Sequence, residues 1–159
     1  ITRDFAELTG KETVYDLYCG TGSIGIFVSA KAKKIIGVEV VEDAVKFARR
    51  EVKRGNKYNG IILDPPAFGH GPDGESWVLE KQINDLLKDV LMLLDPKEHF
   101  LIINTYSLGF SALIVENMIQ KIADNIGLKV KLEAGELYLP AKSGVKLPLG
   151  VYCRFSNIV

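Results

Sequence analysis

Apolar and polar positions follow two different periods along this chain of 159 residues. Short runs that are almost wholly apolar are typical of parallel strands covered on both faces, and apolar residues spaced three or four apart are typical of helices. The apolar runs predict strands at Thr13–Leu17, Lys34–Val41, Tyr58–Asp64, His99–Thr105, Lys129–Leu139 and Gly150–Ser156. The helical spacing predicts helices at Ser23–Ala32, Glu42–Arg54, Leu79–Leu94 and Ser111–Asn125, with loops at 69–76 and 140–149.

The order of these elements predicts the fold class. Strands alternate with helices up to residue 125, and two strands then follow each other. Such a pattern predicts an α/β fold with a Rossmann-like, mostly parallel sheet and an antiparallel hairpin at the C-terminal end. The length suits one domain, residues 1–159. Ligands of such sheets bind at the carboxyl ends of the strands, so motifs at those ends carry the chemistry.

The first strand ends in a glycine-rich turn, within the string VYDLYCGTGSIG at 14–25. Gly20 and Gly22 allow a ligand to approach the backbone, and the following helix offers free N–H groups. Glu39 stands nineteen residues after Gly20, at the end of the second strand. A carboxylate there can accept hydrogen bonds from two ribose hydroxyls. The turn therefore predicts a nucleoside ligand, and because GTGSIG also satisfies G-x-G-x-x-G, an NAD-dependent oxidoreductase stays open.

Asp16 lies four residues before the first glycine, in the pattern D-x-x-x-G-x-G. This pattern resembles motif I of the class I S-adenosylmethionine-dependent methyltransferases. DLYCGTGSIG followed by GVEVVEDAV is similar to the RNA 5-methyluridine branch of that superfamily. The resemblance implies S-adenosylmethionine as the cofactor, with Asp16 near its methionine part. The cofactor-binding residues that it implies are Asp16, Tyr18, Gly20, Thr21, Gly22 and Glu39.

A second motif, Asp64-Pro65-Pro66-Ala67-Phe68, follows the strand expected beside the first one. Two prolines stiffen the loop and remove two N–H groups, which leaves its carbonyls free to accept hydrogen bonds. The motif resembles motif IV of methyltransferases that act on nitrogen atoms of bases. There the acid and a proline carbonyl accept from the attacking amine, and an aromatic ring stacks on the base. This implies Asp64, Pro65, Pro66 and Phe68 as catalytic residues, although Ala67 fills the position directly after Pro-Pro.

The longer strings LDPPAFGHGPDGESW, INTYSLG and LPLGVYCRF resemble a bacterial family of large-subunit ribosomal RNA methyltransferases over most of residues 51–159. Asn104 and Tyr106 end the strand beside motif IV and are candidate substrate contacts. Trp77 is interpreted as a core residue rather than a lid.

Methylation of carbon 5 of a pyrimidine requires a cysteine nucleophile near the base. In the families that this chain resembles, the cysteine lies at one of two positions. This chain has Tyr106-Ser107 at one of them and Pro66-Ala67 at the other, so neither holds a cysteine. Cys19 and Cys153 are interpreted as small buried residues. Nitrogen methylation needs only an aligned neutral amine and electrostatic positioning, so the sequence favours nitrogen.

The interval between Glu39 and Asp64 is short for this superfamily, which normally has a further strand-helix unit there. In one interpretation, VVEDAVKFARR is the helix after strand two and the third strand is absent. The sheet order then becomes two-one-four, and right-handed connections place this helix on the face opposite the first helix. In the other, Val40–Asp43 is the third strand, and Asp43 meets the adenine amino group. A deletion, a chimera and an unbuilt loop all fit this interval.

The formal net charge is zero, whereas a domain that grips nucleic acid alone is usually basic. We therefore expect the RNA partner, ribosomal RNA by resemblance, to be gripped by a domain outside this chain. The chain has only two cysteines, no apolar stretch long enough to span a membrane, and a polar start. Together these features predict a cytoplasmic protein without metal or membrane partners. A non-catalytic module that has lost its cofactor is the alternative that the short interval favours.

Overall fold

The computed structural model describes residues 2–39, 41–70, 76–107 and 109–158. A six-stranded sheet has the order β2-β1-β3-β6-β8-β7. β1, β2, β3 and β6 run parallel, and β8 is antiparallel to both β6 and β7. The strands are β1 Thr13–Leu17, β2 Lys34–Val38, β3 Gly60–Leu63, β6 Phe100–Thr105, β7 Glu133–Pro140 and β8 Lys146–Ser156. The predicted α/β fold with a C-terminal antiparallel hairpin is confirmed.

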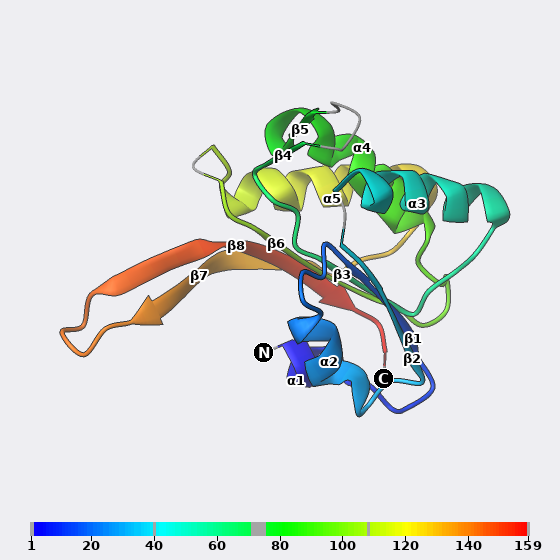
Figure 1. Cartoon of the computed structure of the whole chain (residues 1–159), viewed down its shortest axis with the longest axis horizontal. Helices are drawn as coiled ribbons and strands as arrows, with labels where there is room; N and C mark the ends of the chain where they lie inside the picture. The colour runs from blue at the N-terminus through cyan, green and yellow to red at the C-terminus, as the bar shows by residue number, and fades with distance from the viewer. Residues whose placement is uncertain (1, 40, 71–75, 108, 159) are drawn as a thin grey trace.

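Helices cover the two faces of the sheet unequally. α1 (Thr2–Phe5) and α2 (Ser23–Ser29) lie on one face, and α3 (Val41–Arg54), α4 (Leu79–Met92) and α5 (Ala112–Ile126) lie together on the other (Figure 1). The main core lies between the sheet and the three-helix layer, where the Tyr15 ring stacks on the Tyr58 ring and lies tilted against the Phe47 ring. Because β1 and β3 are central, their side chains are almost all buried. No helix among the described residues is long and apolar enough to cross a membrane.

The short interval after β2 is settled by the start of α3. The helix begins at Val41, so the interpretation of residues 40–43 as a third strand is wrong for Val41–Asp43. Val40 and the side chain of Asp43 lie outside the described residues. β3 pairs directly with β1, which confirms the order two-one-four. α3 lies on the face opposite α2, as right-handed connections require (Figure 1).

Several predicted boundaries differ from the observed ones. α2 ends at Ser29 rather than Ala32, and the short helix α1 was not predicted. The predicted loop at 69–76 contains parts of two short strands, β4 (Phe68–His70) and β5 (Ser76–Val78), which pair with each other in a separate two-stranded sheet. Runs of three residues are too short for alternation to reveal.

The C-terminal hairpin is longer than predicted, because half of the expected loop at 140–149, namely Pro140 and residues 146–149, belongs to the strands. β8 starts at Lys146, and β7 and β8 pair out to Pro140 opposite Lys146. Pro148 lies past a register shift between Leu137 and Tyr138, where the ladder is irregular and tolerates a missing N–H. The hairpin projects beyond the rest of the sheet (Figure 1).

Candidate cofactor and base-binding site

Asp16 binds the start of the helix that follows the glycine-rich turn. Its Oδ2 accepts a hydrogen bond of 3.0 Å from the backbone N–H of Gly25, in the first turn of α2. Asp16 is 1% exposed. Burial raises its pKa, the Gly25 N–H lowers it, and the nearby charges of Asp64 and Glu39 raise it further. In this conformation Asp16 orients the turn, and its predicted contact with the methionine part of a cofactor stays a prediction.

Five of the predicted cofactor residues follow the carboxyl ends of β1 and β2: Tyr18, Gly20, Thr21, Gly22 and Glu39. Gly20 and Gly22 have φ of 56° and 79°, a left-handed backbone that favours glycine. The exposed Glu39 carboxylate accepts a hydrogen bond from the Gly20 N–H. Thr21 lies between the two glycines, with its hydroxyl 3.4 Å from that of Ser23.

Tyr18 takes an unusual backbone conformation as the chain leaves β1. Its φ is 64°, which is uncommon for a side chain other than glycine and is typical of functional sites. The N–H groups of Tyr18 and Cys19 both donate to the Val38 carbonyl, at 2.7 and 3.2 Å. These bonds fix the turn to the end of β2. The buried Tyr18 ring lies against Trp77, with centroids 5.9 Å apart.

Asp64 follows β3 directly, beside the end of β1. Its backbone N–H donates to the Leu17 carbonyl at 3.3 Å, which extends the parallel pairing by one residue. The Asn104 amide, on β6, donates to Asp64 Oδ1 at 3.1 Å. The side chain of Asp64 reaches the surface, yet the surrounding protein removes part of its hydration and raises its pKa, against the lowering effect of Asn104. The sequence motifs on β3 and β6 therefore meet through this hydrogen bond.

The Pro-Pro loop leaves fewer carbonyls free than the sequence suggested. Trp77 Nε1 donates to the Pro66 carbonyl at 2.7 Å, and the Leu79 N–H donates to the Ala67 carbonyl at 3.0 Å. Among the described residues, no group donates to the Pro65 carbonyl. Trp77 is 4% exposed, so it is a core residue as predicted, and it also braces the loop.

A cavity of about 370 Å³ lies between the turn and this loop. It is lined by Tyr18, Glu39, Asp64, Pro65, Pro66, Ala67 and Tyr106. Phe68, the aromatic that the sequence favours for stacking, is 68% exposed in β4 and is not among the lining residues. Tyr106 is 67% exposed and does line the cavity. The structure thus brings together six of the predicted site residues and places Tyr106, rather than Phe68, as the exposed ring at this cavity.

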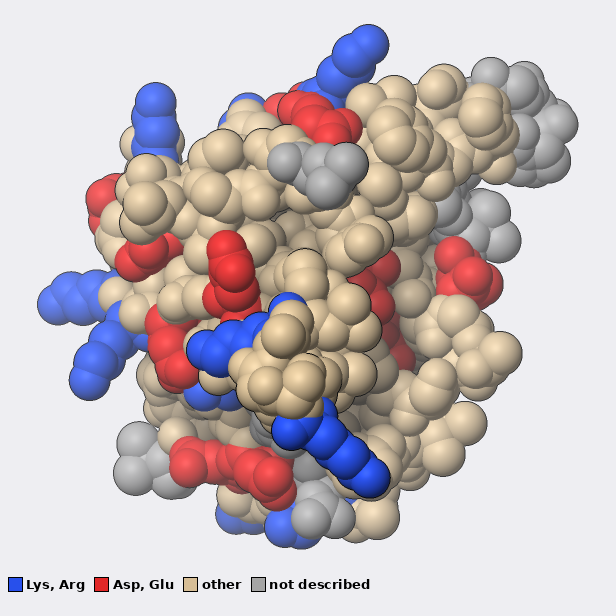
Figure 2. Space-filling model, turned by 90° about the vertical axis from the view of Figure 1, so that its left-hand side faces the viewer, with Lys and Arg blue, Asp and Glu red and all other residues tan. Residues whose placement is uncertain are grey.

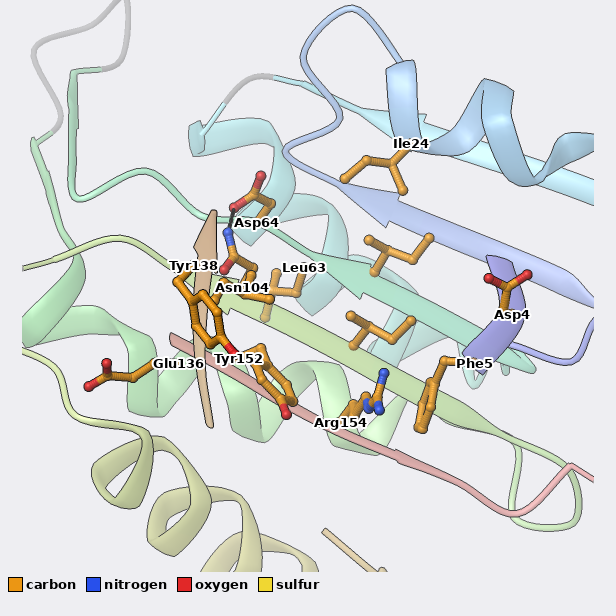
Figure 3. A pocket seen from close by; sticks show the side chains of 13 residues that line it. Asp4, Phe5, Ile24, Leu63, Asp64, Asn104, Glu136, Tyr138, Tyr152 and Arg154 are labelled. Carbon is orange, nitrogen blue, oxygen red and sulfur yellow. Dashed lines mark hydrogen bonds between the residues drawn. The ribbon is translucent and has the colours of Figure 1, made fainter. Parts of the chain in front are cut away.

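A larger cavity, of about 760 Å³, opens on the α1 and α2 face of the sheet (Figure 3). Its lining is mainly apolar, with Asp64 and Asn104 at one end and Asp4, Phe5 and Arg154 at the other. Sequence reasoning missed this groove. Its walls come from segments that are far apart in the chain, and no local motif marks it.

Neither cysteine is set up as a nucleophile. Burial raises the pKa of the Cys153 thiol to about 12. Cys19 is half-buried, rather than buried as predicted, and burial together with the charges of Asp16 and Glu39 raises the pKa of its thiol. Both stay protonated near neutral pH. Among the described residues, no group of three metal-ligating side chains gathers.

The face that carries the carboxyl ends of the strands has no broad region of one charge. On this face, Lys and Arg side chains are interspersed with Asp and Glu (Figure 2). This distribution agrees with the zero net charge, and the described residues on this face form no continuous basic track for a phosphate backbone.

The geometry is matched by solved structures. The chain superimposes on the crystal structure of the SAM-dependent methyltransferase from Agrobacterium tumefaciens with a TM-score of 0.80 and 22% identity, over 96% of this chain and 58% of that one. This chain has the fold of the SAM-dependent methyltransferases. A methyltransferase crystallised with SAH superimposes with a TM-score of 0.60 and 17% identity, over 96% of this chain and 47% of that one.

Sequence relatives carry related names. The chain is 39% identical over 100 residues to a Clostridium tetani protein, and 48% identical over 106 residues to one from Bacillus cereus, both called uncharacterized RNA methyltransferases. These matches cover 50% and 60% of this chain but only 22% and 23% of the relatives. The chain thus spans under a quarter of their length. No protein-family model matches the chain.

The C. tetani alignment is longer than the part of this chain that it covers. Its 100 aligned residues fall on only 50% of a chain of 159, so the relative carries residues without a counterpart here.

Proposed function

We propose that this chain is the catalytic domain of an S-adenosylmethionine-dependent RNA methyltransferase. The observation that carries the proposal is the cavity of about 370 Å³, which joins the cofactor-type residue Glu39 to the base-type residues Asp64, Pro65 and Tyr106. If the site bound only a dinucleotide, Asp64 and the Pro-Pro loop at the end of β3 would have no function in it.

The residues of the turn fit the cofactor. Glycines at 20 and 22 let a ligand approach the backbone, and the exposed Glu39 carboxylate can accept from ribose hydroxyls. When bound, the cofactor supplies a methyl group on a cationic sulfur. Asp16 lies near enough to Asp64 and Glu39 for their charges to raise its pKa, and such a group of acids is suited to a neighbouring cation.

The loop after β3 suits a nitrogen acceptor. Asp64 and the Pro65 carbonyl, to which no described residue donates, provide acceptors for the hydrogens of an amine, which leaves the nitrogen lone pair directed toward the methyl group. Because the carboxylate has a raised pKa, it is also suited to take up the proton that the amine releases. Tyr106 offers a ring on which the base can stack.

Carbon methylation by a cysteine is disfavoured by the same site. Cys153 is fully buried in β8, and Cys19 is a protonated thiol in the turn. The relatives' names support RNA as the substrate class. Ribosomal RNA as the target rests on the sequence resemblance. We further propose that residues outside this chain supply the RNA grip, because the formal net charge is zero and the face in Figure 2 mixes both charges. We also propose that the protein works in the cytoplasm.

Calorimetry of this chain with S-adenosylhomocysteine, with NAD as the control ligand, tests the cofactor part. We expect S-adenosylhomocysteine alone to bind. If a folded chain binds neither ligand, the proposal fails and a non-catalytic module is the better account. If only NAD binds, an NAD-dependent oxidoreductase is the better account.

Transfer of a labelled methyl group to bacterial ribosomal RNA tests the reaction, with the Asp64→Asn variant as the background control. Mass spectrometry of the digested RNA should find an N-methylated nucleoside. A C5-methylated pyrimidine would contradict the nitrogen assignment.

A further inference from the structure

The groove of about 760 Å³ on the α1 and α2 face adjoins the smaller cavity at Asp64. Among the described residues, Asp64 lines both, and Asn104 lines the groove and donates to Asp64 Oδ1 at 3.1 Å. A ligand in the groove therefore lies next to the acid that we propose to face the acceptor amine. The proposed function gives this groove no ligand.

Asn104 carries a hydrogen-bond acceptor that the protein leaves unused. Its amide nitrogen donates to Asp64, and its Oδ1 lies on the other side of the same amide group. No described residue donates to this oxygen, which is buried. A buried acceptor without a partner is rare and costly, so it calls for a donor. We therefore expect a ligand of the groove to bring an N–H or O–H to its Asp64 end.

The middle of the groove suits a flat, apolar group. Two tyrosine rings, Tyr138 and Tyr152, lie near Asn104 (Figure 3). Tyr152 is paired with Asn104 across β6 and β8, so these two side chains share a face of the sheet. Tyrosine rings bind planar ligands by stacking. The apolar part of the lining includes three isoleucines: Ile24, Ile62 and Ile102.

The charges at the groove disfavour an anionic ligand. Arg154 lies at the far end, where its guanidinium donates to both carboxylate oxygens of Glu133 at 2.7 to 3.0 Å and is therefore already paired. Asp4 and Asp64 line the groove as well. A phosphate group meets these acids, whereas an uncharged ring with an N–H does not. The ligand that fits is thus planar, uncharged and a hydrogen-bond donor.

We propose that the groove binds the base of the unpaired RNA nucleotide next to the one that is methylated. The base inserts with an N–H toward Asn104 Oδ1 and one face toward the tyrosine rings. Its sugar and phosphate stay at the groove mouth. This inference rests on the proposed function, which supplies RNA as the substrate class, and it adds a second base contact beside the methylated one.

The neighbouring nucleotide must be unpaired for this contact. In a duplex, the hydrogen-bonding edge of a base is used by its partner and both faces are covered by stacking, whereas single-stranded bases can be splayed out onto aromatic side chains. Water does not reach Asn104 Oδ1 in this conformation, so a ring has to turn aside as the base enters. Tyr138 is 45% exposed and can turn onto the face of the base.

NMR titration with nucleosides tests the groove without methyl transfer. The chain is first saturated with S-adenosylhomocysteine and then titrated with uridine or 3-methyluridine. Uridine has a ring N–H and no amine, so it fits the groove rather than the amine acceptors of the Pro-Pro loop. We expect uridine to bind with roughly millimolar affinity and to shift the ring signals of Tyr138 and Tyr152 and the methyl signals of Ile102. 3-Methyluridine lacks the N–H and should bind at least about fivefold more weakly.

The outcomes separate this inference from the proposed function. A chain that binds S-adenosylhomocysteine but shows no uridine shifts in the groove would overturn the inference and leave the proposed function standing. Equal affinities for the two nucleosides would overturn it as well. A folded chain that does not bind S-adenosylhomocysteine contradicts the proposed function, and the inference falls with it.

Asn104→Leu tests the acceptor, because leucine keeps the size of the side chain and removes the oxygen. We expect the variant to bind uridine no better than 3-methyluridine, so that the preference disappears. If the preference persists, the N–H does not bind Asn104, and the proposal is wrong. Asn104 would then act on Asp64 alone.

Tyr138→Ala and Phe68→Ala form a matched pair for the stacking part. Both rings are exposed, but only Tyr138 lines the groove. We expect Tyr138→Ala to weaken uridine binding at least about fivefold and Phe68→Ala to leave it unchanged. Equal effects of the two variants would contradict the proposed stacking. The NMR spectra also verify that each variant is folded.

Discussion

Asp64 combines three features at the scale of a single residue. It ends a buried parallel strand, accepts a hydrogen bond from Asn104, and has a raised pKa at the edge of a cavity. A carboxylate with a raised pKa is typical of proton-transfer sites, and ion-pair networks can also produce one. Here its principal cause is loss of hydration.

Replacing Asp64 by Asn should separate chemistry from cofactor binding. The amide keeps the size of the side chain but loses the charge and the proton acceptor. We expect methyl transfer to fall about 100-fold or more, while the affinity for S-adenosylhomocysteine changes only a few-fold. Single-turnover kinetics and calorimetry measure the two effects. An unchanged rate in a folded variant would remove Asp64 from the mechanism.

Two exposed aromatic residues compete for the stacking role, and variants can distinguish them. Tyr106→Ala should weaken RNA binding by about 1–3 kcal/mol, while Tyr106→Phe should retain most of it, because the ring supplies the stacking energy. Phe68→Ala is the matched control, since Phe68 does not line the cavity. Steady-state KM values for RNA measure the difference. A larger effect at Phe68 would restore the interpretation made from sequence.

His99 predicts a pH dependence of stability. It is 1% exposed, its Nδ1 lies 2.7 Å from the Asp95 carbonyl oxygen, and burial lowers its pKa below the ordinary 6.5. Below pH 6.5 the unfolded chain takes up a proton that the folded chain resists, so stability falls on acidification. Thermal unfolding from pH 7.5 to 5 should show a smaller decrease for His99→Asn than for the parent. Identical slopes would contradict this role.

At the scale of elements, the end of α3 is tied to the strand that leads to the site. The buried Glu51 accepts hydrogen bonds from Tyr58 at 2.8 Å and Arg54 at 3.1 Å, and also from Asn56. These bonds, chiefly the one from Asn56, hold the pKa of Glu51 below its usual value against the effect of burial. The network fixes the segment through which the chain passes from α3 into β3, and it therefore helps to position Asp64 at the end of β3.

Glu51→Gln should destabilise the chain by about 1–3 kcal/mol, because an amide cannot accept from all three donors. Urea unfolding measures the loss, with Glu98→Gln as a control at an exposed glutamate. A loss no larger than that of the control would show that the network contributes little.

At the scale of the whole molecule, the sheet divides into a packed body and a projecting hairpin (Figure 1). Most side chains at 138–149 are exposed, and Lys146 lies over the Tyr138 ring within the hairpin, at 4.0 Å. The hairpin end therefore contributes little to the core.

Removing Tyr138–Pro148 and joining Leu137 to Leu149 through Asn-Gly should change the melting temperature by less than about 3 °C. Calorimetric unfolding measures this, and an intact parallel sheet should keep the affinity for S-adenosylhomocysteine. A large loss of stability would mean that the hairpin is part of the core.

The sequence by itself determined the elements and the motifs at their ends. Apolar runs such as Lys34–Val38 and the spacing of Asp16, Gly20 and Glu39 are local signals, and the parallel topology follows from strand–helix order with right-handed connections. What only the tertiary structure decided depends on contacts between distant segments. The Pro66 carbonyl accepts a hydrogen bond from Trp77, and Tyr106 rather than Phe68 lines the cavity. α3 starts at Val41, and no third strand lies beside β2 among the described residues. These outcomes follow from packing, which no pattern along the chain encodes locally.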